Sequence, residues 1–369
     1  MITIVQPCEG ELSYPFPCDK EELLFFDIET TGFSAKTSAL YLIGGLYYKE
    51  NHWEIVQWFA DDYESEKELL LSFFDFLKNF SFLVHFNGNG FDIPFILKKC
   101  QQHELTGAEY SFEQIHSFDI YKAIYPHRKR LNIENIKQKT VEHFLHINRE
   151  DTYTGGELIA FYRKFLKIKD SHSEEAQELQ HFLLLHNHDD LAGMLQFSNV
   201  LFLTDLLNGS ITFSGISTQK TDDTVLFQAT LPFSFEVSFT ATTETFHLIL
   251  EKNTLTLSVL TCQEILKYFY DNYKDYFYLP KEDTAIHKSV ATYVDKEFRQ
   301  KAKKENCYTK KEGIFVPSYS EELKPVFRTD YASKQYFIEA NDAFLQDTML
   351  LSDYLNCFLR ENKELLLSS

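Results

Sequence analysis

The sequence has few cysteines, a deficit of basic residues and no long apolar run. Its six cysteines among 369 residues include no Cys-x-x-Cys pair, which excludes a scaffold built on disulfides and favours a reduced, cytoplasmic location. Its 36 basic and 55 acidic residues give a formal net charge of −19, which excludes long-range attraction to nucleic acid or to an anionic membrane. An anionic substrate would therefore need bound cations or a local basic patch.

Membrane segments are also missing from the pattern. No uncharged apolar stretch reaches the roughly 20 residues that a membrane-spanning helix needs. The first residues, MITIVQPCEGELSYPFP, have neither the basic nor the apolar region of a secretory signal. We therefore expect no membrane partner. With 44% hydrophobic residues, the chain can bury substantial cores, and its length suggests two domains.

The hydrophobic pattern predicts an N-terminal lead-in over 1–22, an α/β domain over 23–205 and a smaller α+β region over 206–369. Within the α/β domain, apolar runs predict strands and helical spacing predicts helices. The expected strands are 23–30, 39–49, 52–60 and 81–88, and the expected helical segments are 64–80, 131–170 and 183–205. In the last region we expect β-structure over 224–262, followed by helices over 264–276, 284–305 and 340–366.

The stretch FFDIETTGF places Asp27 and Glu29 two residues apart on an expected strand. A period of two sends both carboxylates to the same face of the strand. Two neighbouring anions repel each other unless a cation lies between them, and Mg²⁺ or Mn²⁺ prefers such oxygen ligands. The alternative is a solvated strand end before a Thr-Gly turn.

A third acid, Asp92, follows the glycine-rich stretch HFNGNGF. Taken alone, Asp92 is most simply the N-cap of the next helix. Gly88 and Gly90 let the backbone pass close to a ligand, but the spacing matches neither a P-loop nor a dinucleotide-binding fingerprint.

The stretch LLLHNHDDLAGM, residues 183–194, holds two histidines and two aspartates. If 183–202 form one helix, Asp190 falls on its apolar stripe and needs a partner or a metal ion. His186 lies one turn earlier on the same side. Gly193 leaves room beside them. Asp189 and His188 are expected to flank the site, nearer to solvent.

Acids in the order Asp-x-Glu, Asp and His-x-x-x-Asp resemble the three motifs of the DnaQ-like (DEDD) 3′–5′ exonucleases, and the resemblance covers about residues 23–205. The segments SFDIYKAIYP, TVEHFLHINREDTYTGGELIAFYRKFL and HNHDDLAGM are similar to YprB-like ribonuclease H-like domains. The resemblance implies a ribonuclease H-like fold, with a mixed central sheet flanked by helices. It also implies Asp27, Glu29, Asp92 and Asp190 as ligands of two Mg²⁺ or Mn²⁺ ions.

The third motif departs from the best-known patterns of this superfamily. One branch has Tyr four residues before the last Asp, and the other has His five residues before it. Here His186 occupies the position of the tyrosine. No other pairing supplies a base, so the resemblance implies His186 as the general base of a two-metal phosphodiester hydrolysis.

The implied partner is a nucleic acid, DNA or RNA, bound as a single strand or at its 3′ end. Phe33 and Phe91 beside the motifs are candidates for base stacking. The basic run HRKR at 127–130 is the favoured backbone contact over 163–169 and 299–304, since most such runs are solvated helix faces. The full set of candidate substrate contacts is Thr30, Phe33, Asn87, Phe91, Arg128 and Arg130.

Two other hypotheses compete with the exonuclease. One is a non-catalytic module that binds nucleic acid or protein on the same fold. The other is a metal phosphohydrolase built on His188 and Asp189, which requires further His and Asp ligands on neighbouring helices and leaves Asp27 and Glu29 unexplained.

Overall fold

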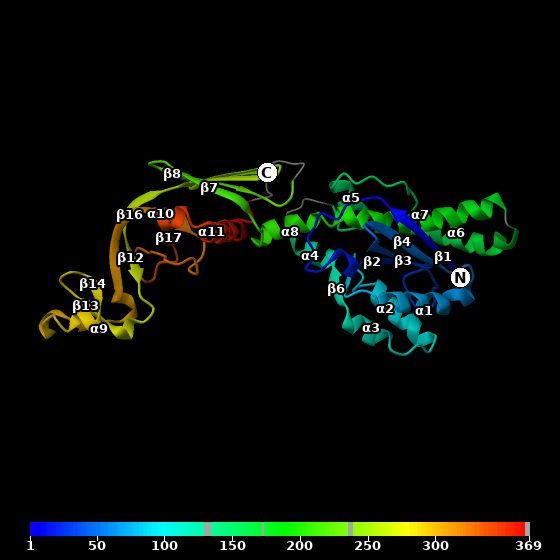
Figure 1. Ribbon diagram of the computed structural model, residues 1–369, viewed down its shortest axis with the longest axis horizontal. Coiled ribbons are helices and arrows are strands. Elements are labelled where there is room, and N and C mark those ends of the chain that lie inside the picture. The colour runs from blue at the N-terminus through cyan, green and yellow to red at the C-terminus, as the bar shows by residue number, and fades with distance from the viewer. Residues whose placement is uncertain (129–133, 172, 235–238, 366–369) are drawn as a thin grey trace. The chain divides into compact units, whose positions relative to one another are not determined.

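The structure is a computed structural model that describes residues 1–128, 134–171, 173–234 and 239–365. The chain divides into two compact units, Met1–Thr204 and Asp205–Ser369, and Figure 1 shows the elements of each. Among the described residues, no helix is long and apolar enough to cross a membrane.

The first unit is built on a mixed six-stranded sheet with the order β1-β4-β3-β2-β5-β6. Strands β1, β4, β3 and β2 pair antiparallel, whereas β2, β5 and β6 pair parallel. The strands are β1 (Ile2–Cys8), β2 (Leu23–Thr30), β3 (Leu40–Lys49), β4 (His52–Phe59), β5 (Phe82–His85) and β6 (His116–Asp119). The mixed sheet is the expected one, but the lead-in contributes an edge strand, β1, that the sequence did not predict.

Helices cover both faces of this sheet. Helices α1, α2 and α3 lie on one side and α6 and α7 on the other (Figure 1). The bounds are α1 (Glu66–Leu77), α2 (Asp92–Gln102), α3 (Ala108–Gln114), α4 (Ile120–Ile124), α5 (Gln138–Phe144), α6 (Gly155–Ile168) and α7 (Glu174–Phe197). The apolar run Leu23–Phe26 is fully buried, because β2 lies inside the sheet with helices on both faces.

The helix that carries the third motif differs from its prediction. Helix α7 begins nine residues earlier than expected, at Glu174, where Ser173 accepts a hydrogen bond from the Ala176 amide as N-cap. It ends at Phe197, and a separate helix, α8 (Val200–Asn208), follows. The assumed single helix over 183–202 is therefore wrong at its end, although His186 and Asp190 do lie one turn apart on α7.

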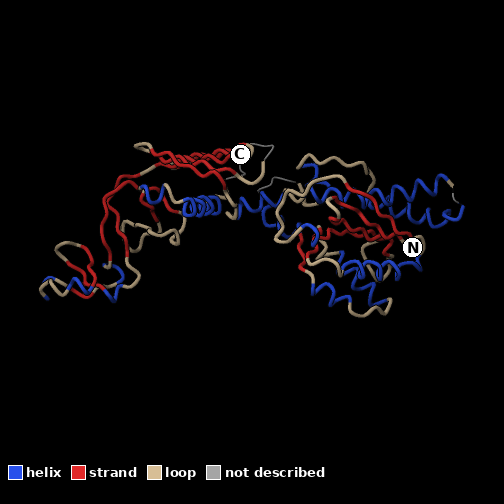
Figure 2. Tube along the Cα trace, viewed as in Figure 1, coloured by secondary structure: helices blue, strands red, loops and turns tan. Residues whose placement is uncertain are grey.

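The described residues of the second unit form three sheets, followed by the C-terminal helices α10 and α11 (Figure 2). A five-stranded antiparallel sheet has the order β7-β8-β11-β10-β9, and two three-stranded sheets have the orders β12-β16-β17 and β14-β13-β15. The strands of the large sheet are β7 (Ser214–Lys220), β8 (Thr224–Thr230), β9 (Phe239–Thr242), β10 (Phe246–Glu251) and β11 (Thr254–Leu260). Its apolar side chains pack with those of α11 (Thr348–Glu361) in one core.

The helices expected over 264–276 and 284–305 are wrong. These segments hold β12 (Cys262–Phe269), β13 (Tyr276–Leu279), β14 (Thr284–His287), the short α9 (Lys288–Ala291) and β15 (Gln300–Lys301). Strand β12 pairs along its whole length with β16 (Tyr308–Ser318), and β16 pairs with β17 (Tyr336–Glu339). These distant partners override a local pattern that fits either structure. The final helical segment is confirmed as α10 (Asp342–Leu345) and α11.

Candidate metal centre

Strand β2 carries the first two acids out of the buried sheet. Asp27 lies opposite Gly44 on β3, and a Cβ atom at Gly44 would lie 2.1 Å from the Oδ1 atom of Asn187. The absence of a side chain at Gly44 therefore lets α7 approach the sheet. Asn187 uses that approach to donate a hydrogen bond of 2.9 Å to the Oδ2 atom of Asp27. Gln57 holds Asn187 in turn through a bond of 2.9 Å to its Oδ1 atom.

Asp92 enters from the loop between β5 and α2. Phe91, and not Asp92, is the N-cap of α2, and Asp92 is the first residue of the helix. The expected alternative role as an N-cap is therefore wrong. The Asp92 side chain is buried, and the backbone amides of Asp92 and Ile28 bond to it. The bond from Ile28 places Asp92 beside the end of β2.

Two buried residues, Asp119 and His85, bind the backbone of the loop 87–89 before Asp92. Asp119 accepts hydrogen bonds from the amides of Asn87 at 2.9 Å and Asn89 at 3.3 Å. His85 accepts at Nδ1 from the Gly88 amide at 3.1 Å, and a Cβ atom at Gly88 would lie 2.6 Å from the imidazole ring. Gly88 is thus required for this close approach, and it serves the loop rather than a ligand.

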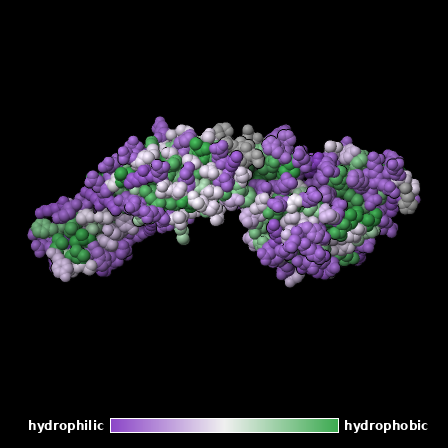
Figure 3. Space-filling model, turned by 45° about the horizontal axis from the view of Figure 1, so that its top comes forward, coloured by the Kyte–Doolittle hydropathy of each residue, from purple (hydrophilic) through white to green (hydrophobic). Residues whose placement is uncertain are grey.

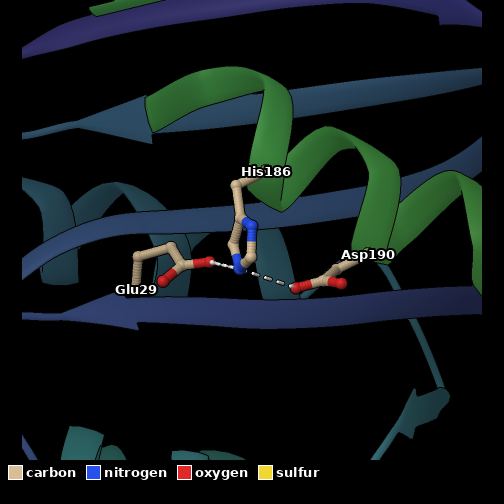
Figure 4. Close-up of side chains that lie close together, drawn as sticks. All are labelled: Glu29, His186 and Asp190. Atoms are coloured by element: carbon tan, nitrogen blue, oxygen red, sulfur yellow. Dashed lines mark ion pairs between the residues drawn. The ribbon is translucent and has the colours of Figure 1, made fainter. Parts of the chain in front are cut away.

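Helix α7 brings the third motif to the strand (Figure 4). The Nε2 atom of His186 lies 3.6 Å from Oε1 of Glu29 and 3.6 Å from Oδ2 of Asp190. One ligand atom from each of these three residues lies within 4.8 Å of the others. Tyr41 donates to the other oxygen of Glu29 at 3.5 Å.

The four carboxylates strongly influence one another. Burial raises the pKa of Asp27 well above its usual value, and the charges of Asp190, Asp92 and Glu29 raise it further. Burial also raises the pKa values of Glu29 and Asp92 to about 7, with Asp190 contributing to both. Each of these acids is therefore costly to ionise without a cation.

This donor set fits divalent metal ions. Carboxylate oxygens are the hard ligands that Mg²⁺ or Mn²⁺ requires. The group whose ligand atoms lie within 4.8 Å of one another comprises Glu29, His186 and Asp190, and the charges of Asp190 and Asp92 act on Asp27. Burial and the repulsion between the acids raise the pKa values of Asp27, Glu29 and Asp92, and bound cations would offset both. Asp27, Glu29, Asp92 and Asp190 could hold such ions, and His186 stands beside them.

The segment 149–151 adds residues that the sequence analysis missed. Asp151 is fully buried, and its Oδ2 atom lies 2.6 Å from Nδ1 of His186. Arg149 donates to Oδ1 of Asp190 at 2.6 Å and to Glu142 at 2.9 Å. Gly193 leaves room for this network, since a Cβ atom there would lie 2.8 Å from Oε1 of Glu142.

The expectation that Asp189 lies nearer to solvent than Asp190 is wrong. Its side chain is 10% exposed, against 16% for Asp190. The Oδ2 atom of Asp189 accepts 2.8 Å hydrogen bonds from the amides of both Glu150 and Asp151. Asp189 therefore fastens the 149–151 segment to α7. His188 is the more exposed of the pair, at 27%, and among the described residues the pair joins no cluster of three or more possible metal ligands.

The candidate substrate contacts are arranged as follows. Phe33 is 95% exposed, and its ring centroid lies 6.2 Å from that of half-buried Phe91. Thr30 donates to the Gly32 carbonyl at 3.0 Å. Asn87 has a positive φ of 62°. The guanidinium of Arg128 lies 4.3 Å from the ring centre of Tyr125, and Arg130 lies outside the described residues.

Comparison with known proteins fits this architecture. Residues 24–201 match the model of the RNase_H superfamily. This segment is a ribonuclease H-like domain. The four candidate metal ligands and His186 all lie within it.

Two further similarities are partial. A DNA polymerase of Ostreid herpesvirus 1 (isolate France) is 35% identical over 52 residues, which are 14% of this chain and 3% of the polymerase. The family B DNA polymerase of the hyperthermophilic archaeon Pyrobaculum calidifontis matches with 13% identity and a TM-score of 0.40, over 74% of this chain and 39% of that chain. The chain thus spans less than half of either polymerase.

Proposed function

We propose that the chain is a metal-dependent 3′–5′ exonuclease of single-stranded nucleic acid, of the DnaQ-like (DEDD) kind. One observation carries this proposal: Glu29 of β2 and Asp190 of α7 each lie 3.6 Å from Nε2 of His186, and the charges of Asp190 and Asp92 act on both Asp27 and Glu29. Burial, together with the charges of the neighbouring acids, raises the pKa values of Asp27, Glu29 and Asp92. Arg149, Asn187 and Tyr41 donate to Asp190, Asp27 and Glu29, and bound cations would offset the repulsion that these hydrogen bonds leave.

In the proposed reaction, Asp27, Glu29, Asp92 and Asp190 hold two Mg²⁺ or Mn²⁺ ions. When bound, such ions lower the pKa of an attacking water and stabilise the charge on the leaving oxygen. The water oxygen bonds to phosphorus, the bond from phosphorus to the 3′ oxygen breaks, and a nucleoside 5′-monophosphate leaves.

His186 is the proposed base. Its Nε2 atom faces Glu29 and Asp190, where it can take the proton of the attacking water. Its Nδ1 atom faces Asp151 at 2.6 Å, and a carboxylate there keeps the proton on Nδ1 and leaves Nε2 free to accept. Asp151 is thus a positioning residue, and Asp189 fixes the segment that carries it.

The substrate strand would reach the metal centre past Phe33. A side chain of this size that is 95% exposed is available for stacking on an unpaired base, and Phe91 lies beside it. Thr30 and Asn87 flank the acids of β2 and α2, and Arg128 and Arg130 would contact the phosphate backbone.

A digest tests the proposal. Single-stranded DNA and RNA labelled at the 5′ end are incubated with the protein in Mg²⁺, Mn²⁺ or EDTA. We expect a ladder that shortens from the 3′ end with metal and no product in EDTA or with Asp27→Asn. A circular single strand should resist cleavage. Intact substrate in every metal would overturn the proposal, and cleaved circles would overturn its exonuclease part.

A further inference from the structure

The sheet β14-β13-β15 of the second unit has two different faces. On one face, Tyr276 and Tyr278 of β13 pack with Ala285, Ala302 and Cys307 in a small core. Phe277 alternates with these tyrosines and so points to the opposite face. It lies directly across from Ile286 on β14 and Lys301 on β15. A row of Ile286, Phe277 and Lys301 therefore crosses the opposite face.

Two cations lie over aromatic rings beside this row. The guanidinium of Arg299 is 5.0 Å from the ring centre of Phe277, and the ammonium of Lys281 is 4.3 Å from that of Phe298. Phe298 is 37% exposed and precedes Arg299 in the chain, so the two pairs adjoin. We call Phe277, Lys281, Phe298, Arg299 and Lys301 the aromatic-basic surface. Figure 3 shows exposed hydrophobic residues gathered at the end of this unit that holds β13, β14 and α9.

The charge around this surface is opposite to that of the chain. Residues 296–304, KEFRQKAKK, hold five basic residues and one acidic residue, so their net charge is 5 − 1 = +4, whereas that of the whole chain is 36 − 55 = −19. Lys301, Lys303 and Lys304 are all exposed. Asp275 pairs with Lys288 and Asp283 with Lys310. With the flanking Asp295 and Glu305 included, the net charge of 295–305 is 5 − 3 = +2, so a local positive charge remains for a ligand.

We propose that the aromatic-basic surface binds single-stranded nucleic acid. Aromatic rings on a sheet face stack with unpaired bases, and flanking lysines and arginines contact the phosphates. An acidic protein partner would use the same cations but would gain less from the exposed ring of Phe298, on which an unpaired base can stack. The ligand class rests on the proposed nuclease function, and the surface would hold substrate outside the metal centre.

Binding of a fluorescein-labelled 20-mer of single-stranded DNA or RNA to the full chain in EDTA tests this proposal without cleavage. The triple variant Lys301→Gln, Lys303→Gln, Lys304→Gln should raise Kd about tenfold or more at low salt. It should also reduce the slope of log K against log salt by up to about 2, because each phosphate contact to a single strand contributes roughly 0.7. Arg299 stays unchanged because it donates to the Ala291 carbonyl.

A second variant separates stacking from charge. Phe298→Ala should raise Kd about fivefold or more while the salt slope stays constant, since stacking carries no counterion release. Two controls carry the same lysine changes and a comparable loss of an aromatic ring on exposed residues of the first unit. They are Lys49→Gln, Lys67→Gln, Lys98→Gln for the charge and Tyr110→Ala, 64% exposed, for the ring. Equal melting temperatures show that each variant folds.

The outcomes also separate this surface from the metal centre. Loss of binding in both test variants supports the surface, even if no strand is ever cleaved. Wild-type binding in the lysine triple variant overturns it, even if the digest shows a metal-dependent ladder. An equal loss in the control triple also overturns it, because the effect is then net charge alone. The proposal is also overturned if the wild-type protein binds neither the DNA nor the RNA 20-mer, or if it binds an acidic peptide and neither 20-mer.

Discussion

The two units of the chain differ in how many polar and charged residues they bury. Of the fifteen buried polar or charged residues among those that the structure describes, fourteen lie in residues 1–204, and Ser318 alone lies in the second unit. Among the described residues, none of the Asp, Glu, Lys, Arg and His side chains of the second unit is buried in its apolar cores. Burial of charge costs free energy. The buried polar and charged side chains of the first unit therefore lower its stability, and we expect them where they serve the metal centre. The cations of the second unit lie where they can meet a ligand.

The largest expected effect comes from the most crowded acid. Asp27→Asn removes a metal ligand and should lower the cleavage rate on the order of 10³-fold, because a bound metal ion contributes several kcal/mol to the transition state. The same change should raise the melting temperature in EDTA, since it removes a buried charge near Asp92, Glu29 and Asp190. Scanning calorimetry beside the digest measures both. Glu251→Gln, an exposed acid of the second unit, should change neither.

The next effect concerns the segment that orients the base. Asp151→Asn should lower kcat about 10- to 100-fold with little change in KM, which is the usual scale for a residue that orients a reacting group. An asparagine amide can donate to Nδ1 and so place the proton on Nε2. The Kd for Mn²⁺ should stay unchanged. Glu150→Gln changes the exposed neighbour and is the control. Equal kcat values for the two variants would show that Asp151 does not position His186.

A smaller effect is expected where α7 approaches the sheet. Gly44→Ala places a Cβ atom 2.1 Å from Asn187 and 2.6 Å from Leu191. Overpacking of this kind costs about 1–3 kcal/mol, and it should displace Asn187 from Asp27. Gly156→Ala in α6, where a Cβ atom meets nothing within 4 Å, should leave the free energy of unfolding unchanged or slightly higher. Urea unfolding compares the two, and equal stabilities would contradict the packing described.

A further expected effect is a pH dependence of stability without metal. The pKa values of Glu29 and Asp92 rise from 4.5 and 3.8 to about 7 on folding, and that of Asp27 also rises. The folded state then binds more protons than the unfolded chain between about pH 4 and pH 7, so the free energy of unfolding should fall across that window. His85, whose pKa falls to about 4 because of burial, opposes this trend below pH 6.5.

Urea unfolding in EDTA at pH 5, 6, 7 and 8 measures this dependence. The three acids outweigh the single histidine, so stability should decrease from pH 5 to pH 7. Asp92→Asn should flatten the decrease, and saturating Mn²⁺ should abolish or reverse it, because metal ions favour the ionised acids. A free energy of unfolding that rises from pH 5 to pH 7 in EDTA would contradict the raised pKa values of these acids in the folded protein.

Local patterns predicted the part of the site that lies on regular elements. The period of a strand places Asp27 and Glu29 on one face, and the period of a helix places His186 beside Asp190. Arg149 and Asp151 could not be predicted, because they reach α7 from positions 41 and 35 residues away. No periodicity spans such a distance. Asp189 was misjudged for the same reason, since its partners are loop amides.

The ribonuclease H-like fold of residues 24–201 was predictable as a class because the resemblance of the acidic motifs implied it, and the apolar runs of the strands agreed with it. The second unit gave a mixed result. The β-rich segment 224–262 has strongly alternating strands, whereas CQEILKYF forms β12 only through its pairing with β16. Short runs of Ile, Leu, Tyr and Phe are compatible with a helix or a strand. Pairing with a distant strand therefore determines the secondary structure of such segments. The expected cytoplasmic location and the choice between DNA and RNA stay predictions.

The central claim is that Asp27, Glu29, Asp92 and Asp190 hold divalent metal ions. Calorimetric titration of the metal-free protein with Mn²⁺ tests it without any substrate. The account predicts about two ions bound per chain in the wild type, fewer in Asp27→Asn and Asp190→Asn, and unchanged binding in His186→Gln, since the histidine acts as a base. No binding by the wild type, or equal binding by the aspartate variants, would contradict the account.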